Sequence, residues 1–126
     1  MPTMEYSYPL TTAPYVFVGK KPVAVMFGGE RVEAKTWRGV YAAVIERCNQ
    51  NPRHHESLMY LRDKTAGKVR VFLSGSPGGM TRPLRIDDDL YGETHYGSET
   101  LMHILVERIL AYTNFDYSDV RIVLKE

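Results

Sequence analysis

The chain has one cysteine, a formal net charge of only +1 and no long apolar run. A single thiol, Cys48, can form neither an internal disulfide nor a thiolate metal site, so we expect a reducing compartment and a cytoplasmic location. No stretch approaches the roughly 18 apolar residues of a membrane span, and the first ten residues lack the basic and apolar segments of a signal peptide. We therefore expect neither a secreted nor a membrane-spanning protein.

The chain also has no excess of charge of either sign, since its 126 residues include 16 Lys and Arg and 15 Asp and Glu. This balance excludes a generally basic coat for nucleic acid, so only a local basic patch could contact phosphates. With 44% hydrophobic and 25% charged residues, the composition is that of a globular protein. A chain of this length forms one domain that buries roughly two thirds of its unfolded surface.

No catalytic, cofactor or metal motif is present, and we expect a protein that is not an enzyme and binds no cofactor. The glycine-rich stretch at residues 74–79 lacks the Gly-Lys-Ser/Thr ending of a nucleotide-binding loop. Metal ligands could come from His54 and His55 with Glu56, or from His103 with Glu107, but the spacing indicates no third ligand. Surface histidines and an i, i+4 helix pair explain these residues better.

Hydrophobic periodicity predicts an α+β fold, with three helices and a small antiparallel sheet of three to five strands in one domain, residues 15–126. Residues 1–14 show no clear period and are expected to form a loosely tied arm. The clearest helix starts at Thr36, which can cap it, and ends near Cys48, a small core residue on its apolar face. A second helix is expected from His54 to Asp63. The predicted strands are residues 15–18 and 23–27, joined as a hairpin, then 31–34, 68–73, 81–86 and 120–124, with Arg121 facing away from its neighbours.

The third helix follows a short polar strand or turn that begins at Leu90. Ser98 can cap this helix, and Glu99 suits the positive end of its dipole. Apolar residues then recur at the helical period and predict a buried face made of Leu101, Ile104, Leu105, Ile109 and Tyr112.

Basic residues cluster in the middle of the chain. Between residues 62 and 85, one acid, Asp63, faces six bases: Arg62, Lys64, Lys68, Arg70, Arg82 and Arg85. A basic strand beside a glycine-rich loop favours phosphate contact, because the loop lets the backbone approach closely. A solvated face whose charges happen to cluster is the other interpretation.

Four segments, in this order, resemble a small bacterial module that is often the last domain of restriction-associated and phage-associated proteins. They are K-V-R-V-F-L-S, R-P-L-R-I, L-Y-G-E-T-H-Y-G-S with the helix after it, and N-F-D-Y-S-D-V-R-I-V-L. The same order is more distantly similar to the DNA-binding domain of the replication sequestration protein SeqA, an α+β domain that recognises hemimethylated DNA. The resemblance covers about residues 36–124. It implies a non-enzymatic DNA-binding domain of a regulatory protein, with sensitivity to DNA methylation.

The resemblance places the reader of the bases in the loop before the long helix, here Thr94, His95, Tyr96, Gly97 and Ser98. His95 stands where the module has asparagine, and Gly97 where it has serine. Asparagine can pair two hydrogen bonds with adenine, whereas histidine offers one useful nitrogen at a time. We therefore expect this loop to contact phosphates, and the resemblance supports recognition of adenine by His95 less directly.

We expect double-stranded DNA as the partner. The residues assigned to it are Lys68, Arg70, Arg82 and Arg85 on phosphates, and Thr94, His95, Tyr96 and Ser98 at the groove. A protein-interaction module, either a homodimer or a regulator that binds another protein, stays open as the alternative. The nine tyrosines, several of them in the N-terminal arm and hairpin, are residues that interfaces favour.

Overall fold

The computed structural model describes residues 4–62 and 72–125, and it confirms the α+β class. The strands form two antiparallel sheets rather than one. In chain order the elements are β1 (Glu5–Pro9), the 3₁₀ turn η1 (Pro14–Phe17), β2 (Lys21–Phe27), β3 (Glu30–Glu33), α1 (Trp37–Asn49), α2 (Pro52–Leu61), β4 (Leu73–Ser74), β5 (Pro83–Asp87), β6 (Leu90–Glu93), α3 (Ser98–His103), the π-helical η2 (Ile104–Ile109), the 3₁₀ η3 (Leu110–Tyr112) and β7 (Val120–Lys125).

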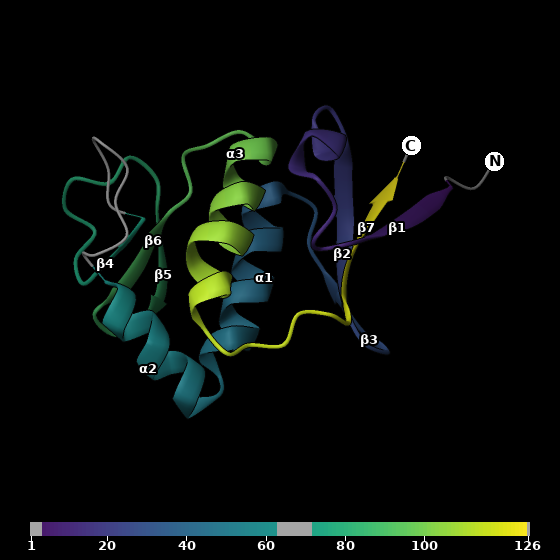
Figure 1. The fold of residues 1–126 in the computed structure, drawn as a ribbon. Helices are drawn as coiled ribbons and strands as arrows, with labels where there is room; N and C mark the ends of the chain where they lie inside the picture. The colour runs from purple at the N-terminus through teal and green to yellow at the C-terminus, as the bar shows by residue number, and fades with distance from the viewer. Residues whose placement is uncertain (1–3, 63–71, 126) are drawn as a thin grey trace.

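Helices α1 and α3 lie between the two sheets, and α2 lies beside the smaller sheet (Figure 1). One sheet has the strand order β1-β7-β2-β3 and the other β4-β6-β5. Helix α1 contacts both sheets, through β2 on one side and β5 on the other, while α3 packs on α1 and η1. Most of the buried apolar side chains form one cluster that runs through all three layers. Among the described residues, no helix is long and apolar enough to cross a membrane.

Helix α1 forms as its sequence predicts. The Thr36 hydroxyl accepts the backbone N–H of Gly39 at 2.9 Å, and the predicted apolar face is buried. Cys48 is completely buried in the core as predicted, and burial raises the pKa of its thiol to about 11. Helix α2 begins at Pro52, two residues before the predicted start, because Asn51 caps it by accepting the N–H of Arg53.

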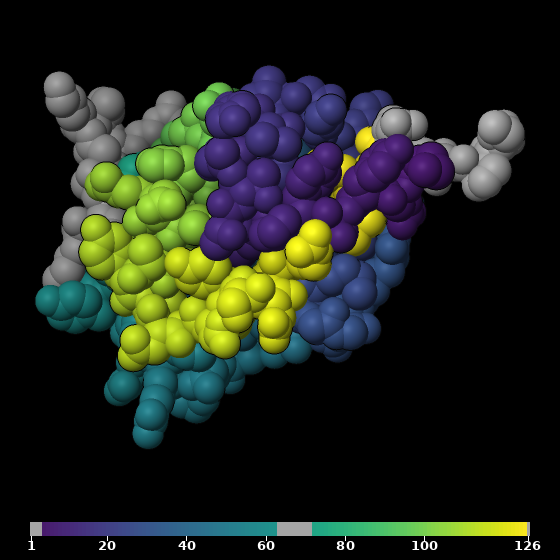
Figure 2. Space-filling view, turned by 45° about the vertical axis from the view of Figure 1, so that its right-hand side comes forward, coloured from purple at the N-terminus to yellow at the C-terminus, as the bar shows by residue number. Residues whose placement is uncertain are grey.

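The prediction of a loosely tied N-terminal arm is wrong. Residues 5–9 form β1, which pairs along its whole length with β7, and the Leu10 N–H donates to the carbonyl of Val120 at 2.9 Å. Leu10 is buried. Figure 2 shows this segment, in purple, against the yellow C-terminal strand and next to the light green α3 region. The arm was missed because β1 has only one residue that is not exposed, Tyr8, and so shows no apolar alternation.

The predicted hairpin at residues 15–18 and 23–27 is also wrong, because residues 14–17 form η1 instead of a strand. The hairpin partner of β2 is β3, and the two strands are joined by a turn at Gly28, whose φ of 62° favours glycine. At the C-terminus, β7 forms as predicted. Arg121 faces away from its buried neighbours and donates to the hydroxyl and carbonyl of Ser7.

The long third helix changes its winding along its length. It begins as α-helix, widens into the π-helical η2 and ends as the 3₁₀ turn η3. A π turn adds about one residue per turn, which rotates the face presented to the core. Leu110 is consequently buried, whereas Tyr112, predicted to face the core, is 64% exposed.

Candidate functional site

Two segments that are distant in sequence line one surface pocket of about 310 Å³. They meet because β5 and β6 are antiparallel neighbours, with Pro83 opposite Glu93 at the end of the pairing. The lining residues are Arg82, which precedes β5, and Thr94, His95, Tyr96 and Gly97 from the loop between β6 and α3. Four of the predicted site residues therefore share one pocket.

The carboxylate of Glu93 joins the two sides of this pocket from beneath. It is buried, and it accepts backbone N–H groups of Thr81 at 2.7 Å, Arg82 at 2.8 Å and Thr94 at 3.1 Å. Burial by itself would raise the pKa of the Glu93 carboxyl, but the backbone N–H groups stabilise the ionised form and leave the pKa below its usual value. The backbone on both sides is therefore held by one ionised group.

The Thr94 hydroxyl connects the pocket to helix α1. It donates to the carbonyl of Arg82 at 2.7 Å and accepts from Nε of Arg38 at 3.1 Å. Arg38 Nη2 also donates to the carbonyl of Pro83 at 3.1 Å. The half-buried guanidinium of Arg38 thus lies next to the Thr94 hydroxyl. It also connects helix α1 to Pro83, which is 45 residues away in sequence.

The pocket carries positive charge that nearby acids do not neutralise. In the part of the chain that the structure describes, Arg31, Arg47 and Arg85 form ion pairs with carboxylates, whereas Arg38 and Arg82 form none. Charges at the pocket are therefore two guanidinium groups against the single carboxylate of Glu93.

The remaining predicted site residues lie elsewhere. Arg85 is exposed on β5 and forms an ion pair with Asp88. Ser98 is not the helix cap, because Gly97 holds that position without a side-chain hydrogen bond, and the Ser98 hydroxyl points to the carbonyl of Phe17 at 3.5 Å. Lys68 and Arg70 fall outside the described residues.

The sequence analysis missed Arg38 and Glu93. A signal for Arg38 was present, since a cation in the first turn of a helix opposes the helix dipole and needs another reason to be there. Glu93 carried a signal as well, because it is an acid at the last position of the short strand β6. Its burial depends on donors from residues 81 and 82, which sequence spacing does not bring near.

No family model matches this chain. No curated protein and no solved structure matches it either. The similarity to the bacterial module and to the sequestration protein therefore stays a hypothesis that rests on short sequence motifs.

The histidine pair predicted to lie on the surface is half-buried. His54 packs edge-on against Phe115 at 5.7 Å between ring centroids, and His55 Nδ1 lies 2.7 Å from the side-chain oxygen of Asn49 and 3.4 Å from Asp87. Within residues 4–62 and 72–125, no cluster of His, Cys, Asp and Glu side chains could hold a metal ion.

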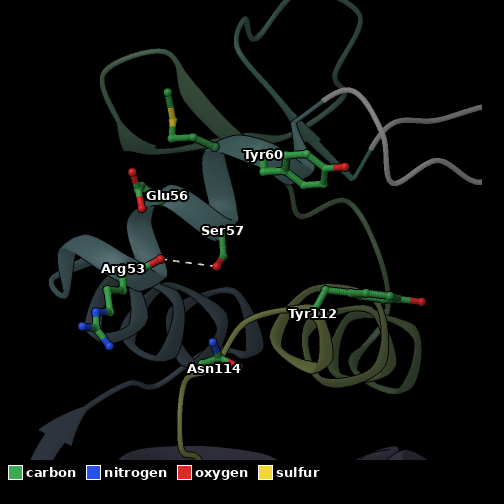
Figure 3. Close-up of a pocket in the computed structure, with 7 residues that line it drawn as sticks. Arg53, Glu56, Ser57, Tyr60, Tyr112 and Asn114 are labelled. Atoms are coloured by element: carbon green, nitrogen blue, oxygen red, sulfur yellow. Dashed lines mark hydrogen bonds between the residues drawn. The ribbon is translucent and has the colours of Figure 1, made fainter.

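A second pocket, of about 760 Å³, lies between α2 and the end of the third helix (Figure 3). Its lining residues are Arg53, Glu56, Ser57, Met59, Tyr60, Tyr112 and Asn114. Tyr60 and Tyr112 project toward the same side in Figure 3, and they are 69% and 64% exposed. The sequence did not predict this pocket, because Tyr112 was expected in the core.

Proposed function

We propose that this chain is a non-enzymatic DNA-binding domain that presents the Arg82 pocket and the loop of residues 94–97 to a duplex. The observation that carries the proposal is the pocket itself. It gathers Arg82, His95 and Tyr96 around a rigid turn and leaves a guanidinium charge uncompensated. A guanidinium and an imidazole can both donate to phosphate oxygens or to base edges.

The charge distribution supports contact through a small footprint. On a chain with a net charge of +1, sequence-independent attraction to DNA is weak, so affinity must come from a few placed contacts. Arg82 supplies one such contact, and Arg38 links the two segments of the pocket by its bonds to the Thr94 hydroxyl and the Pro83 carbonyl. Sensitivity to DNA methylation, read by the loop of residues 94–97, is part of the same proposal.

A binding series with unmodified, hemimethylated and fully methylated duplexes, at low and at physiological salt, tests the proposal. The matched variants are Arg82→Ala and Arg85→Ala, because Arg82 lines the pocket while Arg85 is outside it and paired with Asp88. We expect Arg82→Ala to weaken binding to all duplexes and to reduce the salt slope by about one phosphate contact. Arg85→Ala should change the slope less. Absence of binding to every duplex at low salt would refute the proposal.

His95→Ala tests base reading separately. If His95 contacts a base edge, the variant should lose about 1–3 kcal/mol on a preferred duplex and much less on random DNA. Ser98→Ala is the control next to the loop, since Ser98 does not line the pocket and its hydroxyl points to the carbonyl of Phe17. Equal loss on both duplexes in the His95 variant would assign the residue to the backbone.

A protein-interaction module is the second candidate, favoured by the exposed apolar side chains near the N-terminus. Met4, Tyr6, Tyr15 and Val18 are each more than two fifths exposed. The association we expect is a homodimer, which equilibrium sedimentation of the wild type and of Tyr15→Ser would detect. A monomer at all concentrations would remove this candidate.

Strand addition at β1 is not the route for such an interface. The Leu10 N–H bonds to β7, so by alternation Ser7 and Pro9 point their backbone groups to the open edge. Pro9 has no N–H to offer, and Arg121 Nη2 already donates to the Ser7 carbonyl at 2.9 Å. One donor and one acceptor of this edge are therefore missing or occupied, and we expect an interface here to rest mainly on side chains.

A further inference from the structure

We infer that the pocket lined by Arg82, His95 and Gly97 is a phosphate-binding site, in which His95 contacts the backbone of the nucleic acid rather than a base. The inference rests on the proposed function for the source of the phosphate, but its chemistry comes from the pocket alone. It makes His95 a second phosphate ligand beside Arg82.

The lining of the pocket fits an anion. None of its five lining residues is acidic, and two of them carry nitrogen donors at the ends of exposed side chains. Arg82 donates its backbone N–H to Glu93, and its guanidinium forms no ion pair with a carboxylate among the residues that the structure describes. Arg85, three residues further along, is committed to Asp88. The uncompensated charge is therefore at the pocket and not on the outer part of β5.

The framework of the pocket is rigid before any ligand arrives. The Glu93 carboxylate is occupied by backbone N–H groups, and the Thr94 hydroxyl both donates to Arg82 and accepts from Arg38. Ionised Glu93 lies beneath the backbone and not among the lining residues. The backbone N–H groups of Thr81, Arg82 and Thr94 stabilise its charge, and the guanidinium of Arg82 forms no ion pair with a carboxylate of the described residues.

Phosphate fits these donors better than carboxylate does. Arg82 and His95 belong to the two different segments that line the pocket. The oxygens of a tetrahedral phosphate accept from donors on several sides, whereas a planar carboxylate accepts in one plane. The volume of about 310 Å³ also leaves room for the sugar attached to a phosphate.

Titration of the ¹⁵N-labelled protein with inorganic phosphate tests the site directly, with chloride and acetate at matched ionic strength as controls. We expect saturable shifts of the backbone amides of His95 and Gly97 with phosphate only. Arg82→Ala should weaken phosphate binding at least about tenfold, His95→Ala should weaken it less, and Arg85→Ala should leave it unchanged. Shifts that do not saturate, that acetate reproduces, or that saturate at the same phosphate concentration in Arg82→Ala as in the wild type would overturn the inference.

DNA separates this inference from the proposed function and identifies the source of the phosphate. If phosphate binds in the pocket but no duplex binds, the phosphate site stands and the DNA-binding proposal fails. If duplexes bind but phosphate does not, DNA binding stands and the phosphate site is refuted. A hairpin duplex with a 5′-phosphate that binds at least about tenfold tighter than its 5′-hydroxyl form identifies a strand end, and equal affinity identifies an internal phosphodiester; both support the site.

Discussion

Gly92 on β6 is expected to be intolerant of any side chain, because it lies against the fully buried ring of Tyr41. A Cβ at Gly92 would lie below 3.0 Å from Tyr41 Oη, a separation that real Cβ atoms essentially never show, and 3.2 Å from Tyr41 Cζ. It would also approach Ile86 Cδ1 at 3.3 Å. Since Tyr41 has no exposed surface, its ring cannot swing into solvent to make room.

The size of the effect follows from two opposing terms. Overpacking a well-filled core costs about 1–3 kcal/mol, and the buried hydroxyl puts this contact at the upper end. Alanine stiffens the unfolded chain and returns about 0.4–1 kcal/mol. We therefore expect Gly92→Ala to lower the free energy of unfolding by about 2 kcal/mol.

Tyr41→Phe provides the matched second variant. The Tyr41 hydroxyl has no hydrogen-bond partner in the described part of the chain, and burial raises its pKa, so it stays a neutral, unpaired group. Removing an unpaired buried hydroxyl should cost nothing or stabilise the protein by about 1 kcal/mol. It also removes the atom that would clash with the methyl group introduced by Gly92→Ala, so the double variant should recover about 1–2 kcal/mol relative to additivity.

Urea unfolding followed by the fluorescence of Trp37, the only tryptophan, measures all four proteins of this cycle. Trp37 reports on packing at the start of α1, where its ring centroid lies 5.1 Å from that of Phe17. An unchanged midpoint in Gly92→Ala would show that β6 and α1 are not in the contact described. Strict additivity of the two changes would show that the Tyr41 hydroxyl does not cause the loss.

Three further predictions concern stability. Leu10→Ala should lower the free energy of unfolding in urea by about 2–5 kcal/mol, because Leu10 is buried and the N-terminal segment belongs to the sheet. An unchanged midpoint would show that residues 1–14 are a loosely tied arm after all. The folded-state pKa of Glu93 lies below its ordinary value of 4.5, so the stability that the ionised carboxylate contributes is present above pH 4.5 and is lost as the pH falls through the folded-state pKa. Glu93→Gln should lower the free energy of unfolding at neutral pH by about 1–3 kcal/mol. In thermal melts, the variant should also lose less stability than the wild type as the pH falls. Thr36→Ala should cost about 1 kcal/mol by removing the cap on the Gly39 N–H, whereas Thr36→Ser should retain most of it.

Local structure could be predicted from the sequence wherever it depends on the residues of one segment alone. The helix capped by Thr36 and the outward Arg121 of β7 both follow from short-range pattern and are as predicted. The N-terminal strand was not readable, because β1 is mostly exposed and is held by pairing with residues more than a hundred positions away. The end of the third helix was misread because a periodicity of 3.6 does not describe a π turn.

The candidate site was predictable in part for the same reason. The loop from Thr94 to Gly97 was marked by its motif, and Arg82 by the cluster of basic residues. Arg82 and this loop lie together because β5 pairs with β6, and that pairing depends on strand register and not on composition. The separation of Arg82 from Arg85 likewise depends on an ion pair that only the structure shows.

The residues that hold the pocket together also hold the second sheet to the helix layer. Gly92 lets β6 approach Tyr41, and the next residue, Glu93, ties residues 81–82 to Thr94. Changes at these positions should therefore alter stability and binding together, and a loss of binding there says little about ligand contact. Arg82 and His95 differ, since their side chains are exposed at the pocket and no described contact of the core depends on them. Function can therefore be separated from folding at these two positions, because only there does the pocket contribute side chains that the fold does not need.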